Sequence, residues 1–395
     1  MKVLFVLHSI TANDGSGKAF CRFLPLLINR GVAPLVVCPN NGMMYQNLQK
    51  QGIKVANCFY RYITYPPFDK NAKNILLFLP RLFGRIMANA IGTIQLYRIC
   101  KTFKPDIIHT NVSVTGIGYY ASRLLRIPHV WHIREYGALD FNYYYYPSRP
   151  YQLKRYRKNN SYTICITKDI QCYNGLEHND SSYVVYDGVL STKHLRYNPL
   201  KKPYFLFVGR IERAKGVLSL LQAYAEYCTT CHNPLPLHLA GSMEGQPNYV
   251  AQCYKVVKEA GIEEYVSFLG EQTDILPFYS DATALIVPSL SEGFGFITAE
   301  AMFSGCLVVG HDVAGTKEQF DNGVELTGEE IALRYTQQEQ LVQHLLDITD
   351  AVEKGVFKEH YEPMILRAQR VVKQLYTSER NAEQIFQFYQ DILGN

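Results

Sequence analysis

Short apolar runs alternate with amphipathic stretches along the first half of the chain. The run Lys2–His8 is followed by a glycine-containing loop and then by a helical pattern from about Ser16 to Arg30. Further strand-like runs in this half, separated by helical periodicity, are Pro34–Pro39, Asp106–Asn111 and Pro128–Arg134. This alternation is typical of a parallel sheet covered on both faces. We therefore predict a doubly wound α/β domain.

A second series of the same kind begins after the turn residues Asn198–Pro203. Its predicted strands are Tyr204–Gly209, Pro236–Ala240, Val266–Gly270, Thr283–Pro288 and Leu307–His311. Predicted helices begin near Val217, Asn248, Ile275 and Ile297, and three amphipathic helices follow at about 340–349, 362–376 and 379–393. The second half is thus predicted to be another Rossmann-like domain.

Together the two series predict an α/β fold of two Rossmann-like, doubly wound domains. The expected domains are residues 1–190 and 191–375, and residues 376–395 are expected to form a helix that packs back on the first domain. In such sheets ligands bind outside the carboxyl ends of the strands. The expected site is therefore a cleft between the two domains.

The composition of the 395-residue chain, 47% hydrophobic and 19% charged, fits a folded globular protein. The apolar start MKVLFVLHSI gives way to polar TANDGSG too early for a signal peptide. No run reaches the roughly 18–20 apolar residues that a membrane-spanning helix needs. Ten cysteines without a disulfide framework fit a reducing compartment. We expect a cytoplasmic protein.

One cysteine pair, in Cys228-Thr-Thr-Cys231-His232, matches the attachment sequence of c-type haem. The motif ends an amphipathic helix inside an α/β pattern, and no export signal precedes it. We therefore interpret it as a buried pair of ordinary cysteines.

Charge is distributed unevenly between the two halves. Residues 1–190 contain 23 Lys and Arg against 9 Asp and Glu, a balance of +14, whereas residues 191–395 contain 17 against 26, a balance of −9. A basic half favours anionic partners such as phospholipid headgroups, although a solvated basic face would give the same count. The hypothesis that follows is peripheral contact with the inner face of an anionic membrane. No nucleic-acid partner is expected.

The stretch 74–104 combines helical apolar periodicity with charges of one sign. Its apolar positions are Leu79, Leu82, Phe83, Ile86, Met87, Ala90, Ile91 and Ile94, and its basic ones are Arg81, Arg85, Arg98, Lys101 and Lys104. No acid occurs between Asp69 and Asp106. Such a helix either lies in a bilayer interface or turns its apolar face to the core of the N-terminal domain. We prefer the second interpretation.

The segment Pro288–Glu300 carries the most specific chemistry. A strand ends at Pro288, a glycine-rich turn follows, and a helix is predicted from about Phe296, so the helix start offers backbone N–H groups to an anion. Glu292 and Glu300 flank this turn, eight positions apart. Carboxylates do not bind phosphate, so beside an anion site their expected partners are hydroxyls of a sugar ring and a ribose. Alternatively, Glu300 only stabilises the helix start.

A second segment, Gly209–Gly216, also runs from a strand into a glycine-bounded turn. It brings Arg210 and Lys215 to the carboxyl end of that strand. An arginine and a lysine that converge in this way are suited to a diphosphate. Because transfer from a nucleotide sugar leaves a diphosphate with growing negative charge, both cations would also act on the transition state.

The pairing of GRIERAKG with SEGFGFITAE resembles the donor-site signature of glycosyltransferase family 4, whose members have the two-domain GT-B fold. Further similar segments are Gly15-Ser16-Gly17, Val185–Val189, Phe268–Gly270, Ala299–Gly305 and Gly315–Glu318. The likeness extends over nearly the whole length and is strong after about residue 185.

The resemblance implies a retaining transfer from a nucleotide sugar. We expect a UDP- or GDP-sugar donor and a saccharide or lipid-linked acceptor. The basic, membrane-compatible character of the chain favours a role in surface polysaccharide or glycolipid synthesis. No metal or other cofactor is expected, and the sequence contains no Asp-x-Asp pair. The implied catalytic residues are Glu292, His132, Arg210 and Lys215. The implied donor contacts are Gly15, Gly17, Arg210, Lys215, Gly270, Phe294, Gly295, Phe296 and Glu300, and the candidates for the acceptor side are His109, Arg134 and Glu135.

Three residues depart from the family pattern, and three other functions are alternatives to a glycosyltransferase. Asp187 stands where Asn is usual, Asn111 where a second histidine often occurs, and Lys18 follows the first glycine loop in place of an acid-containing run. A nucleotide-sugar epimerase of the same fold would need additional acid/base carboxylates in the cleft of the basic half, where only Glu135 and Asp140 lie near the right strands. A nicotinamide enzyme would need a third glycine in the first loop. A non-catalytic binding module is the other alternative.

Overall fold

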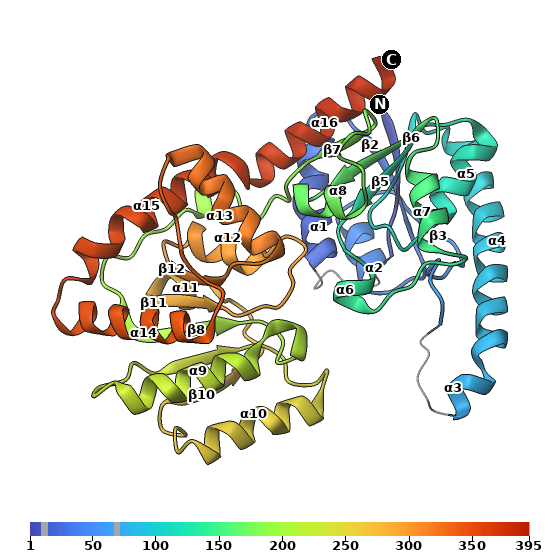
Figure 1. Ribbon diagram of the computed structural model, residues 1–395. Helices are drawn as coiled ribbons and strands as arrows, with labels where there is room; N and C mark the ends of the chain where they lie inside the picture. Colours follow the sequence, from blue (N-terminus) through green and yellow to red (C-terminus); the bar gives the residue numbers. More distant parts are fainter. Residues whose placement is uncertain (9–14, 67–71, 395) are drawn as a thin grey trace. The chain divides into compact units, whose positions relative to one another are not determined.

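The computed structural model of the protein describes residues 1–8, 15–66 and 72–394. The polar TAND stretch, on which the signal-peptide argument partly depends, lies outside these residues. The chain forms two compact units: Met1–Gly188 together with Ser378–Asn395, and Val189–Thr377 (Figure 1).

The first unit contains a parallel sheet with the order β3-β2-β1-β4-β5-β6-β7. Its described strands are β1 Lys2–Val6, β2 Ala33–Cys38, β3 Val55–Asn57, β4 Ile107–Thr110, β5 His129–Ile133, β6 Ser161–Cys165 and β7 Ser182–Val184. Its described helices are α1 Gly15–Asn29, α2 Met43–Lys50, α3 Ala72–Leu76, α4 Phe78–Phe103, α5 Ile117–Leu125, α6 Ala138–Phe141, α7 Arg149–Tyr156, α8 Lys168–Tyr173 and α16 Ser378–Gly394. Of these strands, β1, β2, β4 and β5 were predicted from the sequence, and β3, β6 and β7 were not.

Alternating side chains of β1 divide the core of this unit between two faces of the sheet. Val3 and Phe5 pack with α1 and α16, whereas Leu4 and Val6 pack with α4 and α5. Figure 1 shows α16, in red, lying beside α1, in blue, although the two helices stand at opposite ends of the sequence. Both faces of the sheet are therefore covered, as its near-continuous apolar strands require.

The second unit contains a parallel sheet with the order β10-β9-β8-β11-β12-β13. Its described strands are β8 Lys202–Val208, β9 Leu237–Ala240, β10 Val266–Gly270, β11 Ala282–Val287, β12 Leu307–His311 and β13 Leu333–Tyr335. Its described helices are α9 Val217–Thr230, α10 Pro247–Glu259, α11 Leu276–Asp281, α12 Phe296–Phe303, α13 Ala314–Thr327, α14 Gln338–Glu353 and α15 Phe357–Leu375, with 3₁₀ turns η1 Thr192–His194 and η2 Arg213–Lys215. The predicted α/β fold of two Rossmann-like domains is confirmed.

In this sheet the strand order reverses between β8 and β11. Loops at the carboxyl ends of two such neighbouring strands diverge and leave room for a ligand. The loops after β8 and β11 carry the two segments that the sequence analysis selected.

Three expectations about particular segments need correction or comment. Most of the apolar positions named in the stretch 74–104 are exposed rather than turned to the core, as Leu79 at 71% and Phe83 at 65% show, although Leu96 of the same helix is buried. Cys228 and Cys231 are free and half-buried rather than fully buried, because they lie at the end of α9. Within the described residues, no helix is both long and apolar enough to cross a membrane.

Candidate functional site

The loops after β8 and β11 touch each other through their backbones. The N–H of Leu290 donates to the carbonyl oxygen of Ala214 at 3.0 Å. Gly216, with a left-handed φ of 66°, lies so close to Pro288 that an added Cβ would be 1.9 Å from the Pro288 carbonyl oxygen. Only glycine fits this position, and the contact fixes the relative placement of the two loops.

Lys215 and Glu292 meet where these loops join. The Lys215 Nζ lies 2.6 Å from the Glu292 Oε1, and the two side chains are only 20% and 12% exposed. The Ser289 hydroxyl donates to the same oxygen at 2.8 Å. Ser289, which the sequence analysis did not select, therefore orients the Glu292 carboxylate together with Lys215.

Arg210 has a different setting from Lys215. Its guanidinium pairs with the Glu212 carboxylate at 2.9 Å and is 61% exposed. An exposed ion pair of this kind contributes little to stability. The Arg210 side chain is therefore free to change partners at small cost when an anion binds.

The turn before α12 is held from behind by the first turn of α13. The Gly315 N–H donates to the Glu292 carbonyl oxygen at 2.9 Å. The Gln319 side-chain amide donates to the carbonyl oxygens of Phe294 and Gly295 at 2.5 and 3.0 Å. Gly295 has a left-handed φ of 87° and precedes α12, where no side chain caps the helix start.

Buried polar atoms without partners also gather around this turn. Among the described residues, the hydroxyls of Thr298 and Thr316 and the Oε1 of Gln319 have no hydrogen-bond partner, although all three residues are buried. A Cβ placed on Gly295 would lie 3.3–3.5 Å from atoms of these same three side chains. Unsatisfied buried polar groups are uncommon and call for an explanation such as a ligand or water. The sequence analysis did not select Thr316 and Gln319 for the site.

Two further predicted donor residues, Glu300 and Gly270, lie elsewhere on the same unit. Glu300, in α12, is half-buried. The pKa of the Tyr279 hydroxyl is raised mainly by its burial and further by the nearby Glu300 carboxylate. Gly270 ends β10 with a left-handed φ of 69° and has open space where a side chain would be.

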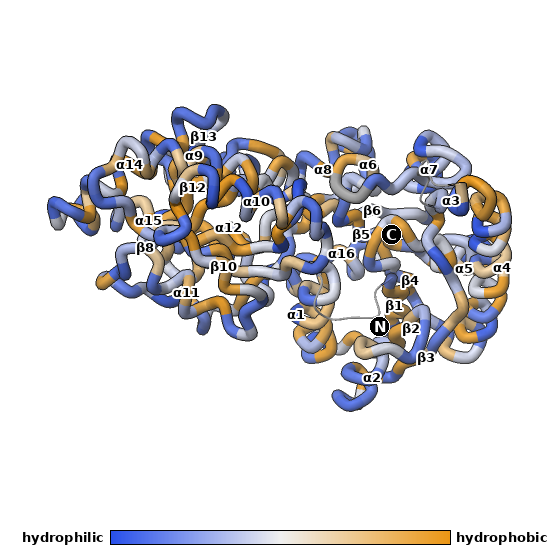
Figure 2. The backbone as a smooth tube through the Cα atoms, turned by 90° about the horizontal axis from the view of Figure 1, so that it is seen from below, coloured by the Kyte–Doolittle hydropathy of each residue, from blue (hydrophilic) through white to orange (hydrophobic). Residues whose placement is uncertain are grey.

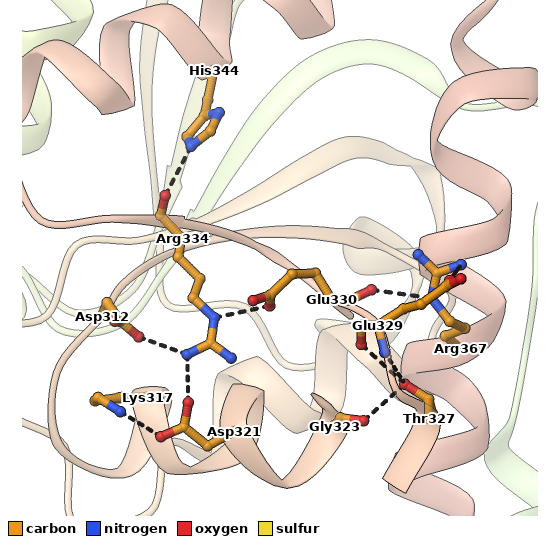
Figure 3. A network of polar contacts seen from close by, with 10 residues as sticks. All are labelled: Asp312, Lys317, Asp321, Gly323, Thr327, Glu329, Glu330, Arg334, His344 and Arg367. Carbon is orange, nitrogen blue, oxygen red and sulfur yellow. Dashed lines mark hydrogen bonds and ion pairs between the residues drawn. The ribbon is translucent and has the colours of Figure 1, made fainter. Parts of the chain in front are cut away.

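A charged network joins residues of α13 and β13 (Figure 3). The Arg334 guanidinium reaches the carboxylates of Asp312 at 3.1 Å, Asp321 at 2.6 Å and Glu330 at 2.9 Å. Lys317, from the Gly315–Glu318 segment, pairs with Asp321. Lys317 is thus part of a structural network that joins α13 to β13.

In the first unit, His109 and His132 lie on the neighbouring strands β4 and β5. The His109 Nε2 is 3.1 Å from the His132 Nδ1, and the His109 Nδ1 is 2.6 Å from the Tyr389 hydroxyl of α16. Both histidines are fully buried. The His132 Nε2 has no hydrogen-bond partner among the described residues. Burial and then the nearby Arg134 lower the pKa of each imidazole well below its usual range, so both rings are neutral at pH 7.

Asp187 and Asn111, two residues that depart from the family pattern, both contact Arg134. The buried Arg134 guanidinium forms a two-bond ion pair with Asp187. The Arg134 Nε also donates to the Asn111 Oδ1 at 3.3 Å. A buried guanidinium needs a charged partner, and the acid at 187 supplies it. Arg134 therefore lies in an internal network beside His132.

Glu135 is likewise buried. Its Oε1 accepts hydrogen bonds from the N–H and hydroxyl of Ser113 at 2.9 and 2.5 Å. The Ser113 hydroxyl also contacts the Tyr145 hydroxyl. Glu135 thus joins β5 to the tyrosine-rich stretch 141–151.

The predicted loop glycines Gly15 and Gly17 form the first turn of α1, whose Ser16 carbonyl oxygen accepts a hydrogen bond from the Asn111 side-chain amide at 3.4 Å.

Residues 194–354 match a protein family described as glycosyl transferases group 1. An uncharacterized glycosyltransferase of Methanocaldococcus jannaschii is 24% identical over 308 residues, which cover 74% of this chain and 82% of the relative. The lipopolysaccharide core biosynthesis mannosyltransferase of Rhizobium meliloti is 30% identical over 145 residues, covering 36% of this chain and 40% of the relative. Among solved structures, HepE of Anabaena in complex with UDP superimposes with a TM-score of 0.76 at 19% identity, covering 99% of this chain and 100% of HepE.

Proposed function

We propose that this glycosyltransferase takes a sugar from a UDP- or GDP-sugar bound at the loops after β8 and β11. Its enzyme class follows from the match of residues 194–354 and from its relatives. The observation that carries the donor proposal is the Lys215–Glu292 pair, which joins the two loops at 2.6 Å. The UDP held by the similar fold of HepE supports a nucleotide donor.

The pair suggests how the donor would be received. A diphosphate draws Lys215 away from Glu292, because a doubly charged anion is the stronger partner for an ammonium group. Glu292 then loses its cationic partner but keeps Ser289, and it becomes an acceptor for a hydroxyl of the transferred sugar. Arg210 exchanges Glu212 for the second phosphate.

The start of α12 supplies the remaining donor contacts. The backbone amides of Phe294, Gly295 and Phe296 precede the first intrahelical bonds, which Thr298 and Ala299 donate to the Gly295 carbonyl oxygen. We assign these amides to the sugar and Glu300 to the ribose. The arrangement neutralises the leaving diphosphate with two cations and a helix start, and we propose a retaining, metal-independent reaction of family 4 type.

His132 is assigned to the transferred sugar on the acceptor side. The assignment uses its Nε2, which lacks a partner among the described residues, and the neutral state of its ring. A neutral imidazole donates to or accepts from a hydroxyl without adding charge near the anomeric carbon. A saccharide or lipid-linked acceptor is proposed because a relative acts in lipopolysaccharide core biosynthesis.

Thermal melting in the presence of a panel of nucleotide sugars tests the donor proposal. A ligand that binds the folded state at 100 times its Kd stabilises it by about 2.7 kcal/mol, and the melting temperature should rise by a few degrees with at least one UDP- or GDP-sugar. Arg210→Ala and Lys215→Ala should abolish the rise. Lys255→Ala, which removes a more exposed lysine that also pairs with a glutamate, should retain it. If no nucleotide sugar raised the melting temperature of the wild-type protein, this result would contradict the proposal.

A further inference from the structure

Helix α4 turns six large apolar residues outward. The exposed large apolar residues on α3 and α4 are Ile75, Leu76, Leu79, Phe83, Ile86, Met87, Ile91 and Ile94. Within α4 they recur three or four positions apart and therefore follow one face of the helix. Figure 2 shows these orange, hydrophobic turns along α4 at the edge of its unit. Single exposed apolar residues are common, but a continuous stripe marks an interaction surface.

The opposite face of α4 explains this orientation. The buried residues of α4 lie four positions apart, and all but Leu96 are small: Ala88, Gly92, Leu96 and Cys100. A Cβ on Gly92 would lie 2.6 Å from the Phe59 carbonyl oxygen, so the chain passes directly against the helix there. A large side chain on this face would push that segment away.

Polar residues of α4 also point toward the same neighbouring segment. The side-chain oxygens of Gln95 and Asn89 accept from the N–H groups of Phe59 and Arg61 at 2.8 and 3.1 Å. The Arg85 guanidinium donates to the Thr64 carbonyl oxygen at 2.7 Å. The helix thus directs part of its polar groups inward and leaves its apolar stripe to the outside.

Every charged residue of α3 and α4 is basic. They are Lys73, Arg81, Arg85, Arg98 and Lys101, and Lys104 follows directly. All but Arg85 are exposed. An apolar centre flanked by cations complements the apolar interior and the anionic headgroups of a bilayer surface.

A groove continues the basic end of the helix. Arg98, Ile99, Thr102 and Phe103 line it together with Lys2, Lys54 and further residues, none of which is acidic. Its volume is about 970 Å³. The groove adds two cations and further apolar surface beside the stripe.

We propose that α3 and α4 form a docking surface for an anionic lipid bilayer. The helix lies in the plane of the interface, with the stripe among the upper acyl chains and the cations at the headgroups. This orientation is distinct from spanning, since the stripe occupies one face of the helix only. The proposal concerns the first unit and is independent of the donor site in the second.

Co-sedimentation of the full-length protein with vesicles tests the proposal. Vesicles of phosphatidylglycerol and phosphatidylcholine in equal parts should bind the protein, and vesicles of phosphatidylcholine alone should bind it at least tenfold more weakly. Raising the salt from 0.1 to 1 M shortens the Debye length from about 10 Å to about 3 Å and should weaken the binding to anionic vesicles.

Two variants separate the apolar and the electrostatic contributions. Leu79→Glu with Phe83→Glu should lower the binding to anionic vesicles at least tenfold, while circular dichroism and melting stay unchanged because both side chains are exposed. Arg98→Gln with Lys101→Gln should weaken binding by about fivefold for each charge removed. Leu366→Glu, a matched change at an exposed leucine of helix α15, should have no effect.

Three outcomes would overturn the proposal. One is the absence of binding to anionic vesicles. Another is undiminished binding by Leu79→Glu with Phe83→Glu. The third is a stable dimer, seen by analytical ultracentrifugation and lost in that same variant, because the stripe would then be covered by a second copy of the chain.

Discussion

Two long side chains, Lys215 and Glu292, form an ion pair at the centre of the proposed donor site. They are 77 positions apart in the sequence, yet they lie at the ends of adjacent strands. The pair keeps both groups oriented, while Lys215 remains exposed enough for its partner to be replaced. This arrangement suits a site that is stable when empty and changes partners when it binds.

Replacing Glu292 with Gln keeps the size and removes the charge. We expect kcat with the identified donor to fall by roughly 10²–10³, the range found when one transition-state contact is removed. The melting temperature should change little, because the side-chain oxygen of Gln can still accept hydrogen bonds from Lys215 and Ser289. Steady-state kinetics and calorimetry would measure both. Glu259→Gln, which breaks the exposed pair with Lys255, is the matched control; an unchanged kcat in Glu292→Gln would remove its proposed sugar contact.

At the same scale, sequence patterns predicted which residues belong to the site better than they predicted which residues contact one another. Strand ends and glycine turns pointed to Arg210, Lys215 and Glu292, since the chain direction alone places them at one edge of a sheet. They could not predict that Arg134 pairs with Asp187, 53 positions away, or that His109 contacts Tyr389, 280 positions away. Such contacts depend on how separate elements pack and leave no local trace in the sequence.

At the scale of elements, most of the long apolar strands were predicted, whereas the internal strand β6 and the short edge strands were missed. β10 and β12 have the predicted bounds, because a run of five mostly apolar residues between turns is a clear signal. β3, β7 and β13 have three residues each, too few for any periodicity. For α4 the periodicity was recognised, but the predicted direction was wrong, because a pattern does not say which face meets the core when small residues allow close packing on the other.

The network around Arg334 is a further feature of this scale. Arg334→Ala should lower the free energy of unfolding by about 1–2 kcal/mol, because it removes three carboxylate partners and leaves Asp312, Asp321 and Glu330 close together. Burial would raise the pKa of Asp321, but Lys317 and Arg334 outweigh it and hold this pKa below its usual value. The contribution of Asp321 is therefore present above pH 4 and lost as the pH falls through its lowered pKa in the folded state.

Urea unfolding of the wild type and Arg334→Ala would measure this difference. Lys354→Ala, which removes an exposed pair with Asp350, is a suitable comparison and should cost less. Equal stabilities of Arg334→Ala and the wild type would contradict a stabilising role of the network.

At the scale of the whole molecule, buried neutral histidines make the first unit sensitive to acid. Burial lowers the pKa values of His109, His129 and His132, that of His129 to about 3. Below about pH 6.5 the unfolded chain binds protons at these positions and the folded chain does not, so stability falls as the pH falls. Between pH 7.5 and 5.5 the loss should be about 1.4 kcal/mol for each histidine, or about 4 kcal/mol together.

Trp131, the single tryptophan, is buried in β5 against His129 and reports on this unit. Its fluorescence in urea at pH 7.5 and 5.5 would measure the expected loss. His129→Gln should reduce that loss by about a third, whereas replacement of the exposed His178 by Gln should leave it unchanged. A loss independent of His129 would contradict this account.

The return of α16 to the first unit makes the second unit an insertion within the first. The chain leaves the first unit after Gly188 and re-enters it at Ser378, and these two residues touch, since a Cβ on Gly188 would lie 2.5 Å from the Ser378 Cα. Just beyond, the Val189 N–H donates to the Tyr376 carbonyl oxygen at 2.8 Å, so the second unit also begins and ends at one point. A gene for the second unit can therefore be cut out whole, and the two loose ends of the first can be joined by a few residues. Removing the last 18 residues, by contrast, would strip an amphipathic helix, whose apolar face lies in the core, from the first unit and leave the inserted one intact.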